Sequence, residues 1–195
     1  MKIKGIKKIV GIISGMSLML FLTSCEFINQ DNCLDKGGKW DGIQKTCVIE
    51  DVESSLKSSK QDVEALMNEW IVFAKRLLAE HGEFHPYGAA MKFDGEIVSI
   101  AGYTGEEIPP SQELIELLTS GFQQAAAKGK YKATALFYDV RIMLPNSTEK
   151  TDAIAVALDH SDAYSVIVFH PYKIVDEQFV FGDLTASKGA NRIFR

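Results

Sequence analysis

The stretch Tyr87–Ala101 reads YGAAMKFDGEIVSIA and carries the strongest local fold signal in the chain. Two apolar-rich runs, 87–93 and 96–101, flank Asp94-Gly95. An Asp-Gly pair between such runs is typical of a two-residue type I′ turn, because both central residues of that turn have positive φ. We therefore expect two antiparallel strands joined by a tight hairpin.

Helical patterns lie on both sides of this hairpin. From Gln61 to Glu80, apolar residues recur every three or four positions, which predicts one buried helical stripe. Ser58 and Gln61 form a capping box that would start this helix, and Gly82 would end it. A second helix is expected to start at Pro109-Pro110-Ser111 and to end at Lys128-Gly129.

The rest of the chain is rich in β-forming runs. They predict the strands Ala133–Leu144, Asp152–His160, Ala163–Tyr172 and Gln178–Phe181. Ala153, Ala155 and Ala157 share one strand face, which suits close contact with a helix. The predicted fold class is α+β, a single antiparallel sheet of five to six strands with two main helices in the order αββαβββ. This order resembles that of roadblock, longin and profilin-like domains, and the resemblance implies an interaction platform.

The first 24 residues have the layout of a secretory signal peptide, with four lysines followed by the uncharged run Ile9–Leu22. This run is shorter than the roughly 20 apolar residues that a membrane-spanning helix needs. Leu22-Thr23-Ser24-Cys25 resembles the bacterial lipobox, which implies that Cys25 is acylated and anchors the mature chain to a membrane. Glu26 follows where an aspartate would favour the inner membrane, so enterobacteria-like sorting implies the outer membrane. An uncleaved anchor and ordinary secretion are the alternatives.

If Cys25 carries lipid, Cys33 and Cys47 remain, and a disulfide is the default for a cysteine pair in an exported chain. Their spacing, Cys-x3-Gly-Gly-x-Trp-x6-Cys, resembles a small cysteine module of exported proteobacterial proteins, which implies no activity. Trp40 is expected to pack over the disulfide, and the alternative is an exposed recognition aromatic. The polar stretch 48–60 indicates a tether. The predicted parts are therefore a signal peptide (1–24), a lipidated and disulfide-closed segment (25–60) and an α+β domain (61–195).

The charge balance argues against nucleic acid as a partner. The whole chain has a net charge of −5, and without the four lysines of residues 1–24 it has 17 basic and 26 acidic residues, a net charge of −9. Such a surface favours a basic protein partner or serves only solubility.

Common enzymatic signatures are missing from the sequence: it has no Gly-rich phosphate loop, nucleophile elbow or zinc-binding helix. No catalytic residue, metal or cofactor is therefore predicted. The candidate binding residues are Trp40, His85, Tyr87, Asp139, Arg141 and His170. Asp139 and Arg141 share one strand face, either as a ligand-facing pair or as part of a solvated face with a cross-strand ion pair.

The stretches 83–89, 139–141 and 150–154 are similar to parts of small bacterial α+β proteins without assigned activity, a class that includes suspected immunity proteins of toxin systems. The leading hypothesis is a membrane-anchored lipoprotein whose α+β domain binds a protein partner in the cell envelope, in an immunity-type version a basic toxin. One alternative is an envelope hydrolase that uses His85, Asp139 and His170. The other is a structural envelope lipoprotein.

Overall fold

The computed structural model describes residues 30–35, 38–48, 52–106, 109–144 and 148–194. The predicted signal peptide, the lipobox and Cys25 lie outside these residues. The chain divides into two compact units, Met1–Val52 and Glu53–Arg195.

The amino-terminal unit contains a short hairpin and a disulfide. Strands β1 (Lys39–Asp41) and β2 (Thr46–Val48) pair antiparallel, and Cys33 is bonded to Cys47 with Cα atoms 5.5 Å apart. A Cβ on Gly38 would lie 2.6 Å from the Cys47 Sγ, so only glycine fits against the bridge. The predicted disulfide is confirmed, and Trp40 is partly buried opposite Cys47 in the ladder.

Helix α2 (Val52–His81) begins nine residues before the predicted start at Gln61. The prediction of a tether is therefore wrong from Val52 onward, and so is the capping box, because Ser58 and Gln61 lie inside the helix. Ser59 explains the difference: it is buried, and its hydroxyl donates to Ser55 O at 2.9 Å and to Asp162 Oδ2 at 3.1 Å. Asp162, 103 residues away, thus stabilises a helical turn around Ser59 whose sequence is typical of a polar linker.

The predicted hairpin is confirmed, but its turn differs from the prediction. Strands β3 (Tyr87–Met91) and β4 (Ile97–Ile100) pair antiparallel. Lys92 N donates to Glu96 O and Gly95 N donates to Lys92 O, which leaves three residues in the loop. Gly95 alone has a positive φ there, of 92°. The loop is therefore a three-residue turn with a left-handed glycine, and not a two-residue type I′ turn.

Helix α3 (Ser111–Ala127) confirms the predicted second helix. It ends in a Schellman motif, in which Lys130 N donates to Ala125 O and Gly129 N to Ala126 O. Gly129 has the positive φ, 63°, that this ending requires.

The sheet is larger than predicted, although the α+β class is confirmed. Its remaining strands are β5 (Ala133–Met143), β6 (Lys150–His160), β7 (Ser165–Val175), β8 (Gln178–Phe181) and β9 (Thr185–Lys188). They follow the antiparallel order β4-β3-β5-β6-β7-β8, and β9 also pairs with β7, which makes seven strands. The predicted single sheet of five to six strands is wrong on the number and on the extra two-stranded sheet. Strand β9 was not predicted because its sequence, Thr-Ala-Ser-Lys, has no alternation of apolar and polar residues.

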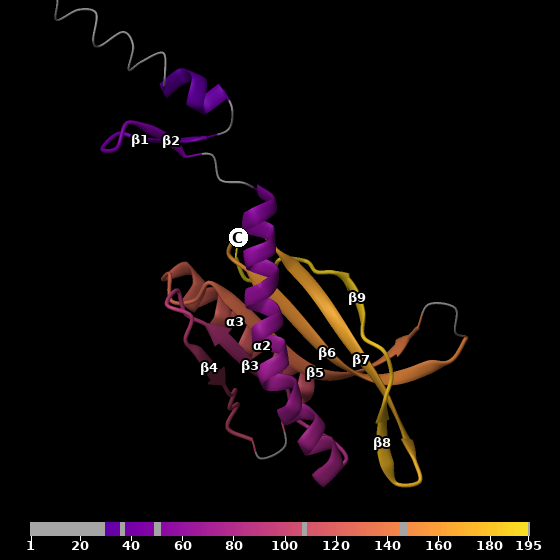
Figure 1. Ribbon diagram of the computed structural model, residues 1–195. Helices are drawn as coiled ribbons and strands as arrows, with labels where there is room; N and C mark the ends of the chain where they lie inside the picture. The colour runs from indigo at the N-terminus through magenta and orange to yellow at the C-terminus, as the bar shows by residue number, and fades with distance from the viewer. Residues whose placement is uncertain (1–29, 36–37, 49–51, 107–108, 145–147, 195) are drawn as a thin grey trace, which may run out of the picture. The chain divides into compact units, whose positions relative to one another are not determined.

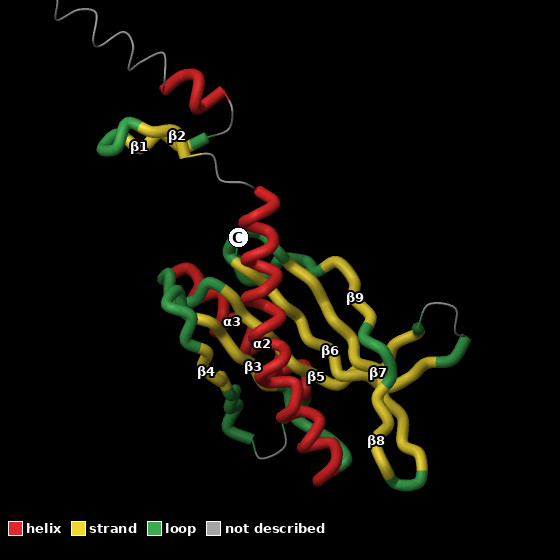
Figure 2. The backbone as a smooth tube through the Cα atoms, in the orientation of Figure 1, coloured by secondary structure: helices red, strands yellow, loops and turns green. Residues whose placement is uncertain are grey.

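The two long helices lie on opposite faces of the sheet (Figures 1 and 2). Helix α2 covers one face with a buried stripe and forms the main core, which includes Leu66, Leu78, Phe137, Val156 and Leu158. Helix α3 covers the other face over β3 and β5 and forms a smaller core, which includes Leu118, Phe122 and Leu136. The carboxyl-terminal Ile193 joins this smaller core.

Strand β7 continues through Pro171, although the sequence suggests a strand end at His170-Pro171-Tyr172. The outer edge of β7 pairs with β9 over residues 166–169 and with β8 over residues 172–175. Pro171 lies between the two partners, where its missing N–H breaks neither ladder. The strand therefore carries a proline within its length.

Candidate functional site

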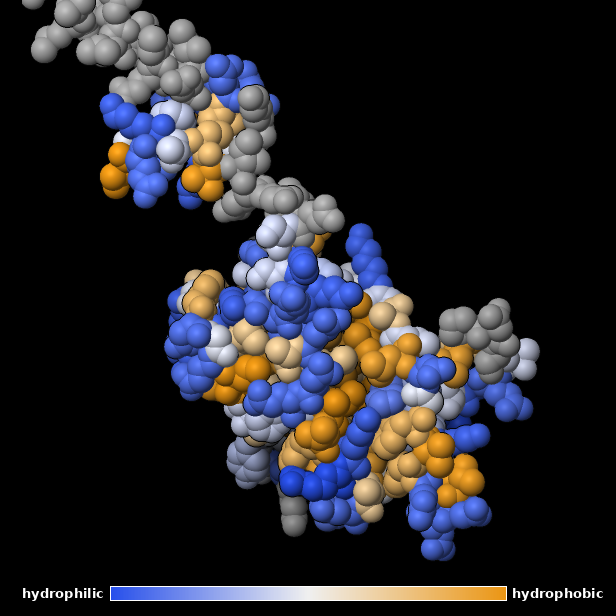
Figure 3. Space-filling model, in the orientation of Figure 1, coloured by the Kyte–Doolittle hydropathy of each residue, from blue (hydrophilic) through white to orange (hydrophobic). Residues whose placement is uncertain are grey.

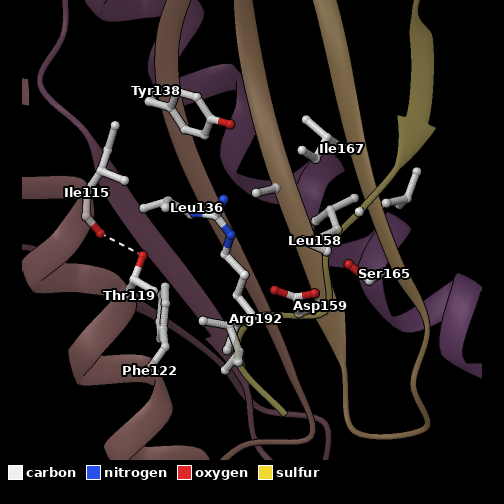
Figure 4. Close-up of a pocket in the computed structure, with 16 residues that line it drawn as sticks. Ile115, Thr119, Phe122, Leu136, Tyr138, Leu158, Asp159, Ser165, Ile167 and Arg192 are labelled. Atoms are coloured by element: carbon white, nitrogen blue, oxygen red, sulfur yellow. Dashed lines mark hydrogen bonds between the residues drawn. The ribbon is translucent and has the colours of Figure 1, made fainter. Parts of the chain in front are cut away.

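A cavity of about 140 Å³ lies on the sheet face that α3 covers (Figure 4). Strand register places its floor residues in two rows across β5, β6 and β7. The apolar row is Leu136, Ala157 and Ile167, and the polar row is Thr134, Asp159 and Ser165. Ala157 is the smallest residue of the apolar row, and its short side chain leaves the floor hollow. The predicted alanine face thus contributes to a cavity beside α3.

Helix α3 forms one wall of the cavity, and the carboxyl-terminal segment 189–194, termed the strap, forms another. Gly189 N donates to Ser165 O at 3.1 Å, and Asn191 N donates to Ser165 Oγ at 2.9 Å. From α3, Gln123 donates to the carbonyl of Arg192 at 2.9 Å. A Cβ on Gly189 would lie 2.8 Å from Val166 N, so only glycine allows this close approach. These contacts hold the strap against the start of β7.

Arg192 is exposed, whereas Phe122, Thr134 and Asp159 are buried, so the cavity runs from solvent near Arg192 into the interior. Figure 4 shows the Arg192 side chain extending towards Leu136 and Tyr138, apart from the Asp159 carboxylate. Burial raises the pKa of Tyr138, and the positive charge of Arg192 opposes that rise. The cavity therefore combines an apolar row and a polar row on its floor with an exposed arginine in its lining.

A second feature is the arm formed by residues 172–181 of β7 and β8. It ends in a type I′ turn at Asp176 and Glu177, whose φ values are 50° and 61°. Ile174 is 63% exposed, Val175 41% and Val180 45%. Figure 3 shows apolar surface along this arm, and β8 is the last strand on its side of the sheet. The arm thus presents apolar side chains beside an outer strand edge.

Tyr87, a predicted binding residue, is instead buried between α2 and the sheet. Its hydroxyl donates to Trp70 O at 2.8 Å and accepts from Ala74 N at 3.1 Å. In an unbroken helix the Ala74 N–H would donate directly to the Trp70 carbonyl, so the Tyr87 hydroxyl is inserted into the hydrogen-bond ladder of α2. The ring stacks on Phe137 with centroids 4.7 Å apart, and burial raises its pKa. This geometry indicates a structural role.

Asp139 and Arg141 have separate partners on the strand face. Tyr172 donates its hydroxyl to Asp139 Oδ1 at 2.8 Å. Burial raises the pKa of Asp139, and the hydrogen bond from Tyr172 opposes that rise. Arg141 Nε lies 3.1 Å from Asp152 Oδ1 on the neighbouring strand. The cross-strand ion pair that the sequence allowed is therefore present, and as an exposed pair it adds little stability.

The two candidate histidines occupy different surroundings. His85 is exposed and lines a groove with Tyr103 and Glu106. His170 packs against Phe181 with ring centroids 4.9 Å apart, and its Nδ1 is buried without a hydrogen-bond partner among the described residues. Burial lowers the pKa of His170, and the charge of Lys75 lowers it further.

The sheet does not join these histidines to Asp139. Ile154 lies between Asp139 and His170 in the register, which puts their strands about 10 Å apart. Within the described part of the chain, no hydrogen bond or ion pair connects His85, Asp139 and His170.

A buried polar network around His160 was not expected as a cluster. Asp162 N donates to His160 Nδ1 at 3.1 Å, which leaves the proton on Nε2, 3.3 Å from Asp62 Oδ2. Lys132 Nζ lies 2.7 Å from the same carboxylate oxygen, and Ser59 donates to Asp162. The Nε2 contact with Asp62 and the Ser59–Asp162 bond connect α2 to the β6–β7 turn, and the Nδ1 bond lies within the turn itself. Asp62 sits at helical spacing from Ser59, but its partners lie far away in the sequence.

No family model, curated protein or solved structure matches this chain. None of the described helices is long and apolar enough to cross a membrane. The described residues also contain no group of three or more histidine, cysteine, aspartate or glutamate side chains arranged to hold a metal ion.

Proposed function

We propose that the protein is an envelope lipoprotein, anchored through Cys25, whose α+β domain binds an extended segment of a protein partner along β8. The observation that carries this proposal is the arm 172–181. Natural sheets protect their edge strands with charges, prolines or bulges, because an unprotected edge pairs with other chains. Strand β8, Gln-Phe-Val-Phe, contains no charge and no proline, and its Val180 is exposed, as is Ile174 on the neighbouring strand β7.

Strand addition would use two parts of the arm at once. Backbone N–H and C=O groups along the outer edge of β8 would supply affinity, and alternate side chains would supply specificity. The resemblance of the αββαβββ order to roadblock, longin and profilin-like interaction platforms supports the same class of function. It remains an analogy of topology.

The charge of the predicted mature chain, −9, favours a basic partner, because complementary charge accelerates association. Asp176 and Glu177 place two carboxylates at the tip of the arm, next to the proposed edge. An immunity-type lipoprotein that captures a basic toxin at the outer membrane is the specific version of this proposal.

Photo-crosslinking in cells tests the binding edge. A crosslinking residue at Val180 should capture one dominant partner, whereas the same residue at Val72 on α2, which is 60% exposed, should not. Val180→Lys should weaken partner capture, and Val72→Lys is the matched control. Equal capture with both lysine variants would show that the arm is not the binding edge.

The anchor has its own test. Labelled palmitate should be incorporated into the full chain and lost in Cys25→Ser. Incorporation that persists in Cys25→Ser would contradict lipidation at this residue.

A further inference from the structure

We propose that the cavity beneath α3 is a binding site for a small apolar carboxylate, with its hydrocarbon body over Ala157 and its carboxylate at Arg192. This site lies on the opposite sheet face from α2 and is separate from the β8 edge. The proposal of this site therefore does not depend on the proposed protein partner.

The cavity is large enough for a compact hydrocarbon. Its volume, about 140 Å³, is close to the roughly 150 Å³ of an engineered protein cavity that stays dry and binds benzene. Its apolar lining comes from three layers, with Ile115 on α3, Leu136 and Ile167 on the sheet, and Ile193 on the strap. These dimensions suit a ring or a branched chain of about six to eight carbons.

The charges in the cavity set the orientation of the ligand. Arg192 is an exposed residue of the lining, Figure 4 shows its side chain extending towards Leu136 and Tyr138, and among the described residues no ion pair involves its guanidinium. A guanidinium presents paired donors that match a carboxylate. A carboxylate therefore belongs at Arg192, and the apolar body belongs inside.

The hollow itself depends on Ala157. Its neighbours in the row, Leu136 and Ile167, are large, so the space above the central strand is open only because residue 157 has no atoms beyond Cβ. A leucine there would occupy the space of the ligand body. Arg192 is exposed, so a change of its head group should leave the fold intact.

The test uses hexanoate and benzoate as probes, with hexanol and hexylamine as neutral and cationic counterparts. The protein is the full chain. Calorimetry gives the dissociation constants, and NMR of the methyl groups of Ile115, Ile167 and Ile193 locates the probe. Hexanoate should bind about tenfold more tightly than hexanol, the value of about one charge-assisted hydrogen bond. Hexylamine should bind more weakly still.

Variants assign the binding to the cavity. Arg192→Gln should weaken hexanoate about tenfold and leave hexanol unchanged, whereas Arg141→Gln, which removes an arginine from the opposite face, should change neither. Ala157→Leu should abolish binding of every probe. Urea unfolding confirms that each variant is folded.

Three results would overturn the proposal: no binding of either carboxylate to the wild-type chain, unchanged binding by folded Ala157→Leu, or equal affinities for hexanoate and hexanol that Arg192→Gln does not alter. The last result would leave an apolar cavity without carboxylate recognition. If Ala157→Leu fails to fold, the methyl shifts and Arg192→Gln still decide.

Discussion

Replacing Tyr87 with phenylalanine separates a structural role from a binding role for this predicted site residue. The change removes only the hydroxyl that lies 2.8 Å from Trp70 O and 3.1 Å from Ala74 N. The ring, its stack on Phe137 and its edge contact with Phe73 remain. Any effect therefore reports the inserted hydroxyl.

The expected loss in the free energy of unfolding is about 1 kcal/mol. Each hydrogen bond contributes about 0.5–1.5 kcal/mol net, which would give about 1–3 kcal/mol for two. Once the hydroxyl is gone, however, the Trp70 carbonyl and the Ala74 amide can bond to each other and recover about one of them. Tyr87→Ala also removes the stacked ring and should cost about 3–5 kcal/mol.

Urea unfolding followed by circular dichroism measures both changes. Tyr103→Phe is the matched control, because Tyr103 is 79% exposed and its hydroxyl should contribute nothing measurable. The reasoning is refuted if Tyr87→Phe keeps wild-type stability, and a simultaneous loss of partner capture would return Tyr87 to the binding surface.

Three further predictions concern other parts of the fold. Because the folded pKa of His170 is lowered, the unfolded chain binds its proton more readily, so this contribution to stability is full above about pH 6.5 and falls as the pH drops below it. His170→Leu should remove that part of the acid loss between about pH 7 and 5 in urea titrations, and an unchanged pH slope would count against it. Glu177→Gly should stabilise the arm by about 0.5–1 kcal/mol, because relief of a left-handed backbone cost of about 1–2 kcal/mol outweighs the roughly 0.4–1 kcal/mol that glycine adds in unfolded-chain entropy. A fall in the midpoint of thermal unfolding would contradict this. Gly88→Ala places a Cβ 2.5 Å from Phe122 Cζ and should cost about 1–3 kcal/mol, and a double-mutant cycle with Phe122→Leu should show coupling between the two sites rather than additivity.

Features that depend on residues close together in the sequence could be predicted without the structure. The helix α3 between Pro109-Pro110-Ser111 and Lys128-Gly129, the strand β8 and the Cys33–Cys47 bridge all agree with the sequence analysis. The proline and glycine that bound α3 and the cysteine pair are local features, so one sequence reveals them, whereas the predicted capping box and type I′ turn are wrong. The predictions are wrong where the local pattern is ambiguous: the polar start of α2 was assigned to a tether, and the short strand β9 was not predicted.

The candidate site shows the same division. Residue types singled out Asp139, Arg141 and Tyr87, but their partners turned out to be Tyr172, Asp152 and the backbone of α2. Side-chain chemistry indicates what a residue can bond to, while the register and the packing determine which group is in reach. Neither follows from spacing along the chain.

By itself, the sequence determined the α+β class, most of the strands, both long helices and the bridge between Cys33 and Cys47. Only the tertiary structure decided that the two helices lie on opposite faces, that Ser59 is buried against Asp162, and that Ala157 forms the floor of a cavity. The physical reason is the separation along the chain between the residues that interact. Periodicity, caps and turns reflect interactions between near neighbours, whereas burial and cavities depend on contacts between distant residues, such as Ser59 and Asp162, 103 positions apart.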